Sequence, residues 1–242
     1  MNRKILYIAL ILVGYKSAKF TIHHFIDTDD YIHWFLADTI TSIFRMLALI
    51  ATFWFLHSIN KKIKTEFHLH AIKPVLIFFF CSQLLLWLRN WIYDAEPLGS
   101  YFFTIMLISN LLVGFFEEFF YRGALLEVCL EKLSPWRTIF LVSFIFMLIH
   151  FDSQPLYTFP ALFLFGFVQV LFRFSGASLI VMAITHAFYD IAVYNFTIPI
   201  TFSNYGWSFA EVCISLCFIA YMFSRPEIRN KFGLKLKNYT YN

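Results

Sequence analysis

Long apolar runs separated by short polar connections make up most of this sequence. A transmembrane helix needs about 20 mostly apolar residues to cross a hydrocarbon core of about 30 Å. Eight runs are candidates for such spans, at residues 4–22, 36–58, 71–92, 101–129, 136–151, 156–173, 177–199 and 207–224. Because 60% of the residues are hydrophobic and only 14% are charged, a soluble domain is not expected. We predict an all-α, polytopic membrane helix bundle with about eight transmembrane helices.

Positive charges fall on alternate connections between these runs. Lys and Arg occupy residues 2–4, 61–64, 132–137, 173 and 225–237, whereas acidic or uncharged residues occupy 27–30, 94–96, 152 and the stretch around 203. The positive-inside rule therefore predicts a multi-pass plasma (inner) membrane protein with both termini in the cytoplasm. Lys16 and Lys19 follow the apolar stretch Ile5–Tyr15, where a signal-peptide cleavage site needs small residues, so we expect an uncleaved first span.

No linker in the sequence is long enough to separate a second domain. We predict one integral membrane domain over residues 1–242, with a motif-bearing core at about 101–199. The net charge of +4 is modest and forms no basic stripe, so the expected partner is the lipid bilayer and not a nucleic acid. The cysteines have no paired spacing, and we interpret them as small core residues: Cys81, Cys129, Cys213 and Cys217.

Ionisable residues inside apolar runs point to function, because a charged side chain at mid-membrane costs at least about 2.5 kcal/mol. In the run NLLVGFFEEFFYRGALLEVCL, Glu118 and Arg122 lie one helical turn apart, so Arg122 can neutralise Glu118. Glu117 points about 100° away from that pair and has no sequence-local cation, which leaves it free to act as an acid or base. Gly114 and Gly123 allow another helix or a substrate to approach closely.

Three further polar positions in the apolar runs each have a structural alternative. His150 ends the fifth run in FMLIH, where a single histidine is typically an interfacial or hydrogen-bonded residue. His186 and Asp190 lie one turn apart in HAFYD, and such a pair can simply lock two helices together. Asp38 and Arg45 lie two turns apart; we expect them to satisfy each other or to snorkel to opposite edges, rather than Arg45 pairing with a site carboxylate.

The three motifs EExxxR, FxxxH and HxxxD, in this order on three separate helices, resemble the CAAX protease and bacteriocin-processing (CPBP, or Abi) family of intramembrane endopeptidases. This resemblance rests on residues 114–190. It implies a peptide or protein substrate, and it implies that Glu117 and His150 activate the water that attacks the scissile carbonyl. It further implies that His186 and Asp190 lie near the developing oxyanion. Glu118 and Arg122 are then the supporting pair.

Four alternatives stay open at this point. Asp190 either orients His186 or stays protonated and donates to the oxyanion, because an ionised carboxylate only accepts hydrogen bonds. Glu117, His150 and His186 also form a ligand set for zinc, although the resemblance favours a cofactor-free mechanism and the HExxH signature is absent. A non-catalytic membrane protein of the same fold, acting in immunity, regulation or scaffolding, is the alternative to an enzyme. A small transporter with a proton-relay glutamate fits the three motifs less well.

Overall fold

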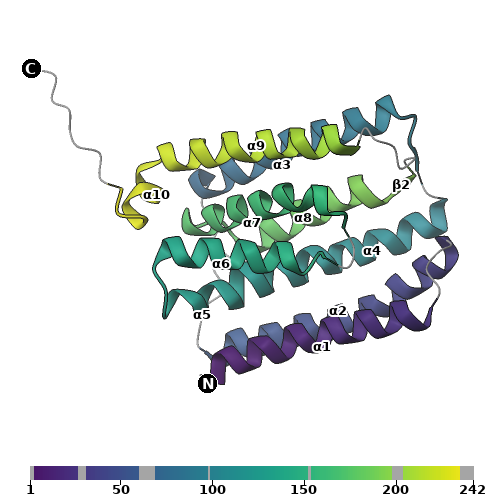
Figure 1. The fold of residues 1–242 in the computed structure, drawn as a ribbon, viewed down its shortest axis with the longest axis horizontal. Helices are drawn as coiled ribbons and strands as arrows, with labels where there is room; N and C mark the ends of the chain where they lie inside the picture. Colours follow the sequence, from purple (N-terminus) through teal and green to yellow (C-terminus); the bar gives the residue numbers. More distant parts are fainter. Residues whose placement is uncertain are drawn as a thin grey trace, which may run out of the picture.

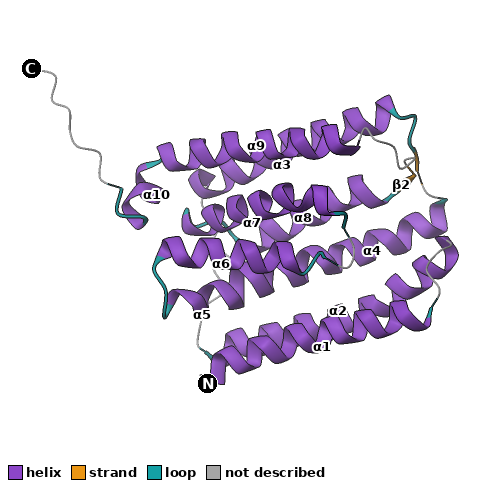
Figure 2. Ribbon diagram, in the orientation of Figure 1, coloured by secondary structure: helices purple, strands orange, loops and turns teal. Residues whose placement is uncertain are grey.

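The computed structural model describes residues 3–26, 31–59, 69–97, 99–151, 154–197 and 204–234. Within them the chain is almost entirely helical (Figure 2). The longer helices are α1 (Arg3–Phe25), α2 (Tyr31–Ser58), α3 (Leu69–Ile92), α4 (Ser100–Glu117), α6 (Pro135–Leu148), α7 (Phe159–Phe174), α8 (Leu179–Tyr194) and α9 (Asn204–Ser224). The shorter elements are the π-helix η1 (Glu118–Leu125), α5 (Leu126–Leu130), the 3-10 helix η2 (Leu156–Thr158), α10 (Pro226–Lys231) and the strands β1 (Glu96–Pro97) and β2 (Phe196–Thr197).

The predicted all-α polytopic bundle is confirmed, and every predicted span corresponds to a helix or to a run of consecutive helices. Six segments of the described chain are long and apolar enough to cross a membrane, including the lysine-interrupted α1. The other two, α6 and α8, have 14 and 16 residues. At 1.5 Å per residue they extend only about 21–24 Å, less than a full hydrocarbon core. The second motif lies at the end of α6 and in the turn after it, and the third motif lies in α8.

The helices pack in layers (Figure 1). α1 and α2 form one edge of the bundle, α3 and α9 form the other, and α4, α6, α7 and α8 lie between them. The N-terminus and α10 lie at the same end of the bundle. At the opposite end, the two-residue ladder between β1 and β2 joins the α3–α4 connection to the α8–α9 connection, a feature that the sequence did not predict.

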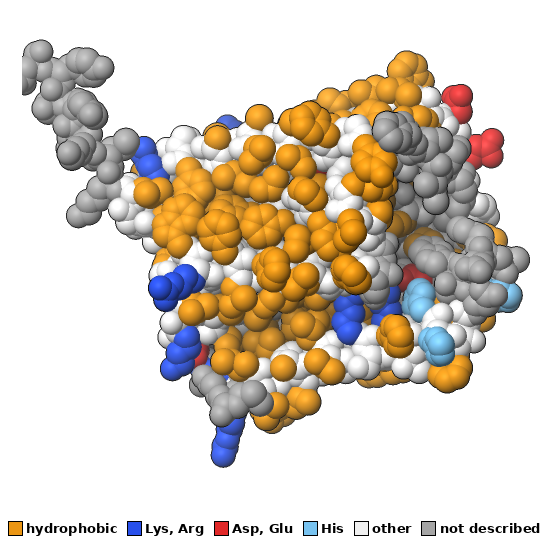
Figure 3. All heavy atoms as spheres, in the orientation of Figure 1, with side chains coloured by type: hydrophobic (Ala, Val, Ile, Leu, Met, Phe, Trp, Pro, Cys, Tyr) orange, Lys and Arg blue, Asp and Glu red, His pale blue; other side chains and the backbone are white. Residues whose placement is uncertain are grey.

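The surface fits a lipid environment. On the face shown in Figure 3, hydrophobic side chains cover the middle, while most Lys and Arg side chains lie toward the end that holds the N-terminus. Large apolar side chains such as Phe20, Phe80 and Trp91 are exposed, which a bilayer tolerates and water does not. Of the connections used to predict orientation, residues 27–30, 61–64, 152 and 203 lie outside the described part of the chain.

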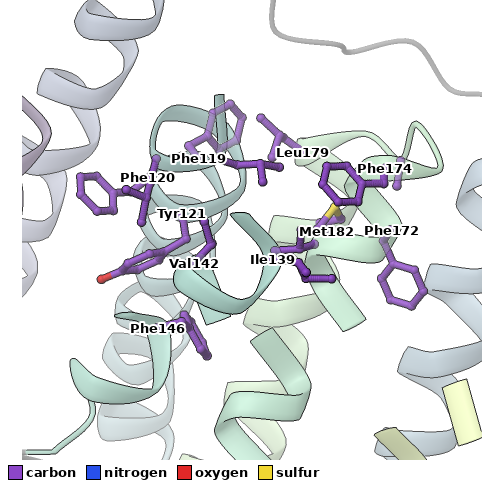
Figure 4. Close-up of a cluster of buried hydrophobic side chains, with 14 of the residues drawn as sticks. Phe119, Phe120, Tyr121, Ile139, Val142, Phe146, Phe172, Phe174, Leu179 and Met182 are labelled. Carbon is purple, nitrogen blue, oxygen red and sulfur yellow. The ribbon is translucent and has the colours of Figure 1, made fainter. Parts of the chain in front are cut away.

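Close packing in the centre of the bundle brings α4 and α8 together at Gly114. A Cβ atom at this position would lie 2.5 Å from the Ala183 carbonyl oxygen and 2.8 Å from the Ala187 nitrogen, so only glycine permits this approach. The predicted close approach at Gly114 is therefore to another helix. Around the neighbouring π-helix, apolar side chains from four elements form the core (Figure 4), among them Phe120 and Met182.

Polar residues outside the motifs behave as structural links. Arg45 Nη2 lies 2.7 Å from Asp38 Oδ1, which confirms the predicted pairing of these two residues. The same guanidinium donates to Tyr15 on α1 and to Ser109 on α4, so one buried network ties three helices together. The interpretation of all four cysteines as core residues was wrong, because Cys213 and Cys217 are exposed, while Cys129 is buried.

Candidate active site

The first motif lies where α4 becomes a π-helix. Glu117 is the last residue of α4, and Glu118 and Arg122 belong to η1, where every residue is buried. Arg122 Nη1 lies 3.2 Å from Glu118 Oε1, so the predicted ion pair is present. The Arg122 guanidinium also lies over the Phe146 ring, 4.2 Å from its centroid. Arg122 thereby neutralises Glu118 and links the first motif to α6.

The π-helical turn is a feature that residue spacing did not reveal. A spacing of four residues places Glu118 and Arg122 on one face in either geometry, so the motif alone gives no sign of the wider turn. Such turns occur frequently at functional sites, because they change the direction of side chains along an otherwise regular helix. Here the transition falls between Glu117 and Glu118. Glu118 pairs with Arg122, whereas Glu117 faces the two histidines of the site.

His150 reaches the site from the turn that follows α6. Its Nδ1 lies 2.8 Å from the backbone oxygen of Phe146, one turn earlier in the FxxxH motif. A carbonyl oxygen only accepts, so Nδ1 carries the hydrogen of this bond. In a neutral ring, Nε2 then has a free lone pair. This nitrogen lies 3.8 Å from Glu117 Oε1.

His186 approaches the same carboxylate from α8. Its Nδ1 lies 2.9 Å from Glu118 Oε1, and its Nε2 lies 3.8 Å from Glu117 Oε2. The distance from this Nε2 to Asp190 Oδ2 is also 3.8 Å, which is too long for a hydrogen bond. Orienting His186 was one of the two roles predicted for Asp190. The hydrogen bond that holds the His186 ring is instead the one to Glu118.

Glu117 is the centre of this arrangement. Its side chain is almost fully buried, with the residue 8% exposed, and its Oε2 has no hydrogen-bond partner among the described residues. Each of its oxygens faces the Nε2 atom of one histidine across 3.8 Å. Polar atoms separated by this distance commonly hold a bridging water, which also satisfies the buried acceptor. The three predicted motifs therefore meet around one carboxylate.

A cavity of about 310 Å³ adjoins the cluster and is within the size range of small-molecule sites. His150, His186 and Asp190 line it, whereas Glu117 lies behind them and does not. The cavity extends between α3, α7, α8 and α9, since its walls include Phe78 on α3 and Ser215 on α9.

Two charged residues of this cavity were not singled out from the sequence. Glu211 on α9 accepts a 2.5 Å hydrogen bond from Tyr189, the neighbour of Asp190. Arg89, near the end of α3, lines the cavity as well. Both lie inside apolar runs, so the cost of a charge in the membrane was the signal that could have revealed them.

The distances between the side chains of Glu117, His150 and His186 can be compared with those of a metal site. No group of three or more His, Cys, Asp or Glu side chains in the described part of the chain has an arrangement that holds a metal ion. Ligands at about 2.0–2.2 Å from zinc in an ideal tetrahedral site lie about 3.3–3.6 Å from one another, whereas 3.8 Å separates Glu117 from either histidine. The distances are therefore somewhat longer than those of an ideal tetrahedral zinc site.

Comparison with known proteins agrees with the geometry. Residues 99–192 match the family described as type II CAAX prenyl endopeptidase Rce1-like, and this segment contains all six motif residues. A search of curated proteins gives no match. The matched family is a protease family and corresponds to the resemblance carried by the three motifs. Residues 99–192 of this membrane protein are therefore an Rce1-like domain of the CAAX protease family.

Proposed function

We propose that the protein is an intramembrane endopeptidase that hydrolyses peptide bonds of membrane-associated proteins or peptides. The observation that carries this proposal is the buried Glu117 carboxylate, which faces His150 and His186 across 3.8 Å on either side. A buried ionisable group in a membrane is costly unless it is used or paired. The Rce1-like match over residues 99–192 supports the same activity.

In the proposed first step, a water molecule lies between Glu117 Oε1 and His150 Nε2 and donates a hydrogen bond to each. Both atoms are acceptors when His150 is neutral with its hydrogen on Nδ1, so the water oxygen keeps its lone pairs for the substrate. The water oxygen attacks the peptide carbonyl carbon while its proton passes to Glu117. A base placed in this way typically contributes about 10²–10⁴-fold to the rate.

In the second step, the tetrahedral intermediate collapses. The carbon–nitrogen bond breaks, and Glu117 returns its proton to the leaving amine, so the enzyme regains its starting state. His186, held by Glu118, and Asp190 lie beside the position of the oxyanion. A donor at that position stabilises the negative charge that develops on the carbonyl oxygen. Glu118 and Arg122 act as the supporting pair that fixes His186.

We propose further that the reaction needs no metal cofactor. The spacing of Glu117, His150 and His186 suits a bridging water better than a zinc ion. The second candidate function is a non-catalytic membrane protein of the same fold. It is favoured by the network of Asp38, Arg45 and Ser109, in which buried polar groups tie helices together without any of the motif residues.

The test compares membranes of cells that produce the wild-type chain, Glu117→Gln or no chain. Peptide termini in each membrane fraction are quantified by mass spectrometry, at equal abundance of the two chains. We expect a set of cleaved termini that appears only with the wild-type chain. Identical termini in all three samples would favour the non-catalytic function.

A further inference from the structure

The position of the cavity determines how a substrate reaches the motif residues. Its wall includes residues at the ends of α3 and α8, at the connection before α7 and at the start of α9: Arg89, Tyr194, Gln154, Thr158, Trp207 and Ser208. All of these element ends lie away from the end that holds the N-terminus and α10 (Figure 1). The cavity therefore extends from His186 toward the far end of the bundle.

Charge assigns this far end to one side of the membrane. Lys and Arg are concentrated at the end with α10, at Arg3, Lys4, Lys132, Arg137 and Arg229. The far end instead carries Asp94 and Glu96 at the α3–α4 connection. By the positive-inside rule, the end with α10 faces the cytoplasm and the cavity mouth faces the other side.

Arg89 gives this mouth a chemical preference. Its guanidinium donates to Asn90 Oδ1 at 3.2 Å and weakly to the Ala192 carbonyl at 3.5 Å, and none of its hydrogen bonds among the described residues goes to a carboxylate. The Glu211 carboxylate interacts with Arg89 electrostatically, but its hydrogen bond comes from Tyr189. A guanidinium that lines a cavity without a hydrogen bond to a carboxylate can still bind an anionic ligand through paired hydrogen bonds.

We propose that peptide substrates enter this cavity from the non-cytoplasmic face and that Arg89 binds a carboxylate group of the entering peptide. That the entering peptide is a substrate rests on the proposed endopeptidase function. The access route and the anion preference do not depend on it, because both can be measured without any cleavage. A negative result here and an inactive enzyme are therefore distinguishable.

The access route is tested by cysteine labelling in intact cells. The four native cysteines are first replaced by alanine. Single cysteines are then introduced at Thr158 or Val193 in the cavity wall. The exposed Ser134, near the other end of the bundle, is the control position. An impermeant maleimide should label Thr158→Cys and Val193→Cys in intact cells, and Ser134→Cys only after permeabilisation. The reverse pattern, or no labelling of either cavity position before denaturation, would overturn the proposal.

The anion preference is tested on the purified single-cysteine proteins. The probes are two methanethiosulfonates, one carrying a sulfonate and the other a trimethylammonium group. Replacing Arg89 by Gln should lower the ratio of the anionic to the cationic labelling rate at least about threefold, because Arg89 and the labelled positions line the same cavity and its charge attracts the anionic probe. Replacing Glu211 by Gln is the matched control and should raise this ratio. An unchanged ratio in Arg89→Gln would refute the subsite.

Protection from labelling identifies the anion. Acetyl-trileucine with a free carboxylate should slow labelling of Thr158→Cys more than its amide does, and this difference should vanish in Arg89→Gln. Equal effects of acid and amide would contradict a carboxylate subsite. In vesicles, labelling of Thr158→Cys is compared between phosphatidylglycerol and phosphatidylcholine. Slower labelling in phosphatidylglycerol that depends on Arg89 would show that a lipid phosphate occupies the position, which also overturns the proposal.

Discussion

Replacing Gly114 by alanine should force α4 and α8 apart. The added Cβ would lie 2.5 Å from the Ala183 carbonyl oxygen and 2.8 Å from the Ala187 nitrogen, and neither backbone atom can rotate away. Overpacking of this kind costs about 1–3 kcal/mol, partly offset by the better helix propensity of alanine, about 1 kcal/mol. We therefore expect a net loss of up to about 2 kcal/mol in the free energy of unfolding.

The same displacement should impair the site, because α4 carries Glu117 and α8 carries His186. A shift approaching 1 Å between positioned groups can reduce a catalytic rate by about 10²-fold. The assay is thermal unfolding of the detergent-purified protein, where a loss of this size lowers the midpoint by up to about 8 °C. Cleavage of a substrate found in the membrane comparison provides the second readout.

Gly14→Ala is the matched control. Gly14 lies in α1, and no atom lies within 4 Å of the position that a Cβ would take there, so alanine should leave stability unchanged or raise it by up to about 1 kcal/mol. If Gly114→Ala proved as stable as Gly14→Ala, the close approach of α4 and α8 would not be what fixes the distance between Glu117 and His186, and the reasoning would be refuted.

Three further predictions concern the buried charges. Asp38→Asn should lower the free energy of unfolding by about 3–5 kcal/mol in thermal unfolding, because Arg45 would be buried without its carboxylate. Glu131→Gln, at the more exposed pair with Lys4, should lower it by at most about 1 kcal/mol. Equal losses would contradict the structural role of the network. Glu118→Gln should reduce both stability and cleavage, because Glu118 pairs with the buried Arg122 and holds His186. Adding Arg122→Met removes the unpaired cation and should restore stability but not cleavage. Recovery of cleavage in the double variant would argue against Glu118 as the residue that orients His186. Strong chelators should leave the cleavage rate of purified protein unchanged, and a loss that Zn²⁺ restores would contradict the metal-free mechanism.

Much of the architecture was predictable from the sequence, because apolar length, charge alternation and residue spacing are local properties. The spacing of Glu118 and Arg122 predicted their ion pair, and that of Asp38 and Arg45 predicted theirs. The resemblance carried by the three motifs, and not their spacing, predicted that these three helices meet. Each of the two ion pairs lies within a single helix, which is the range over which spacing is informative.

Other features depend on how distant helices pack, and spacing does not encode that. The hydrogen bond between Glu118 and His186 joins residues 68 positions apart, so Asp190 was the partner that local spacing offered. The cavity between α3 and α9 was missed for the same reason. The exposure of Cys213 likewise depends on which face of α9 packs against its neighbours.

The central claim is that Glu117 acts as the base that activates water. It is tested most directly by the cleavage rate of purified wild-type protein and Glu117→Gln, on a substrate taken from the membrane comparison, with both proteins shown to unfold at similar temperatures. The account predicts that the variant loses at least about 10²-fold in rate, as expected on removal of a general base. A Glu117→Gln protein that cleaves this substrate at the wild-type rate would contradict it.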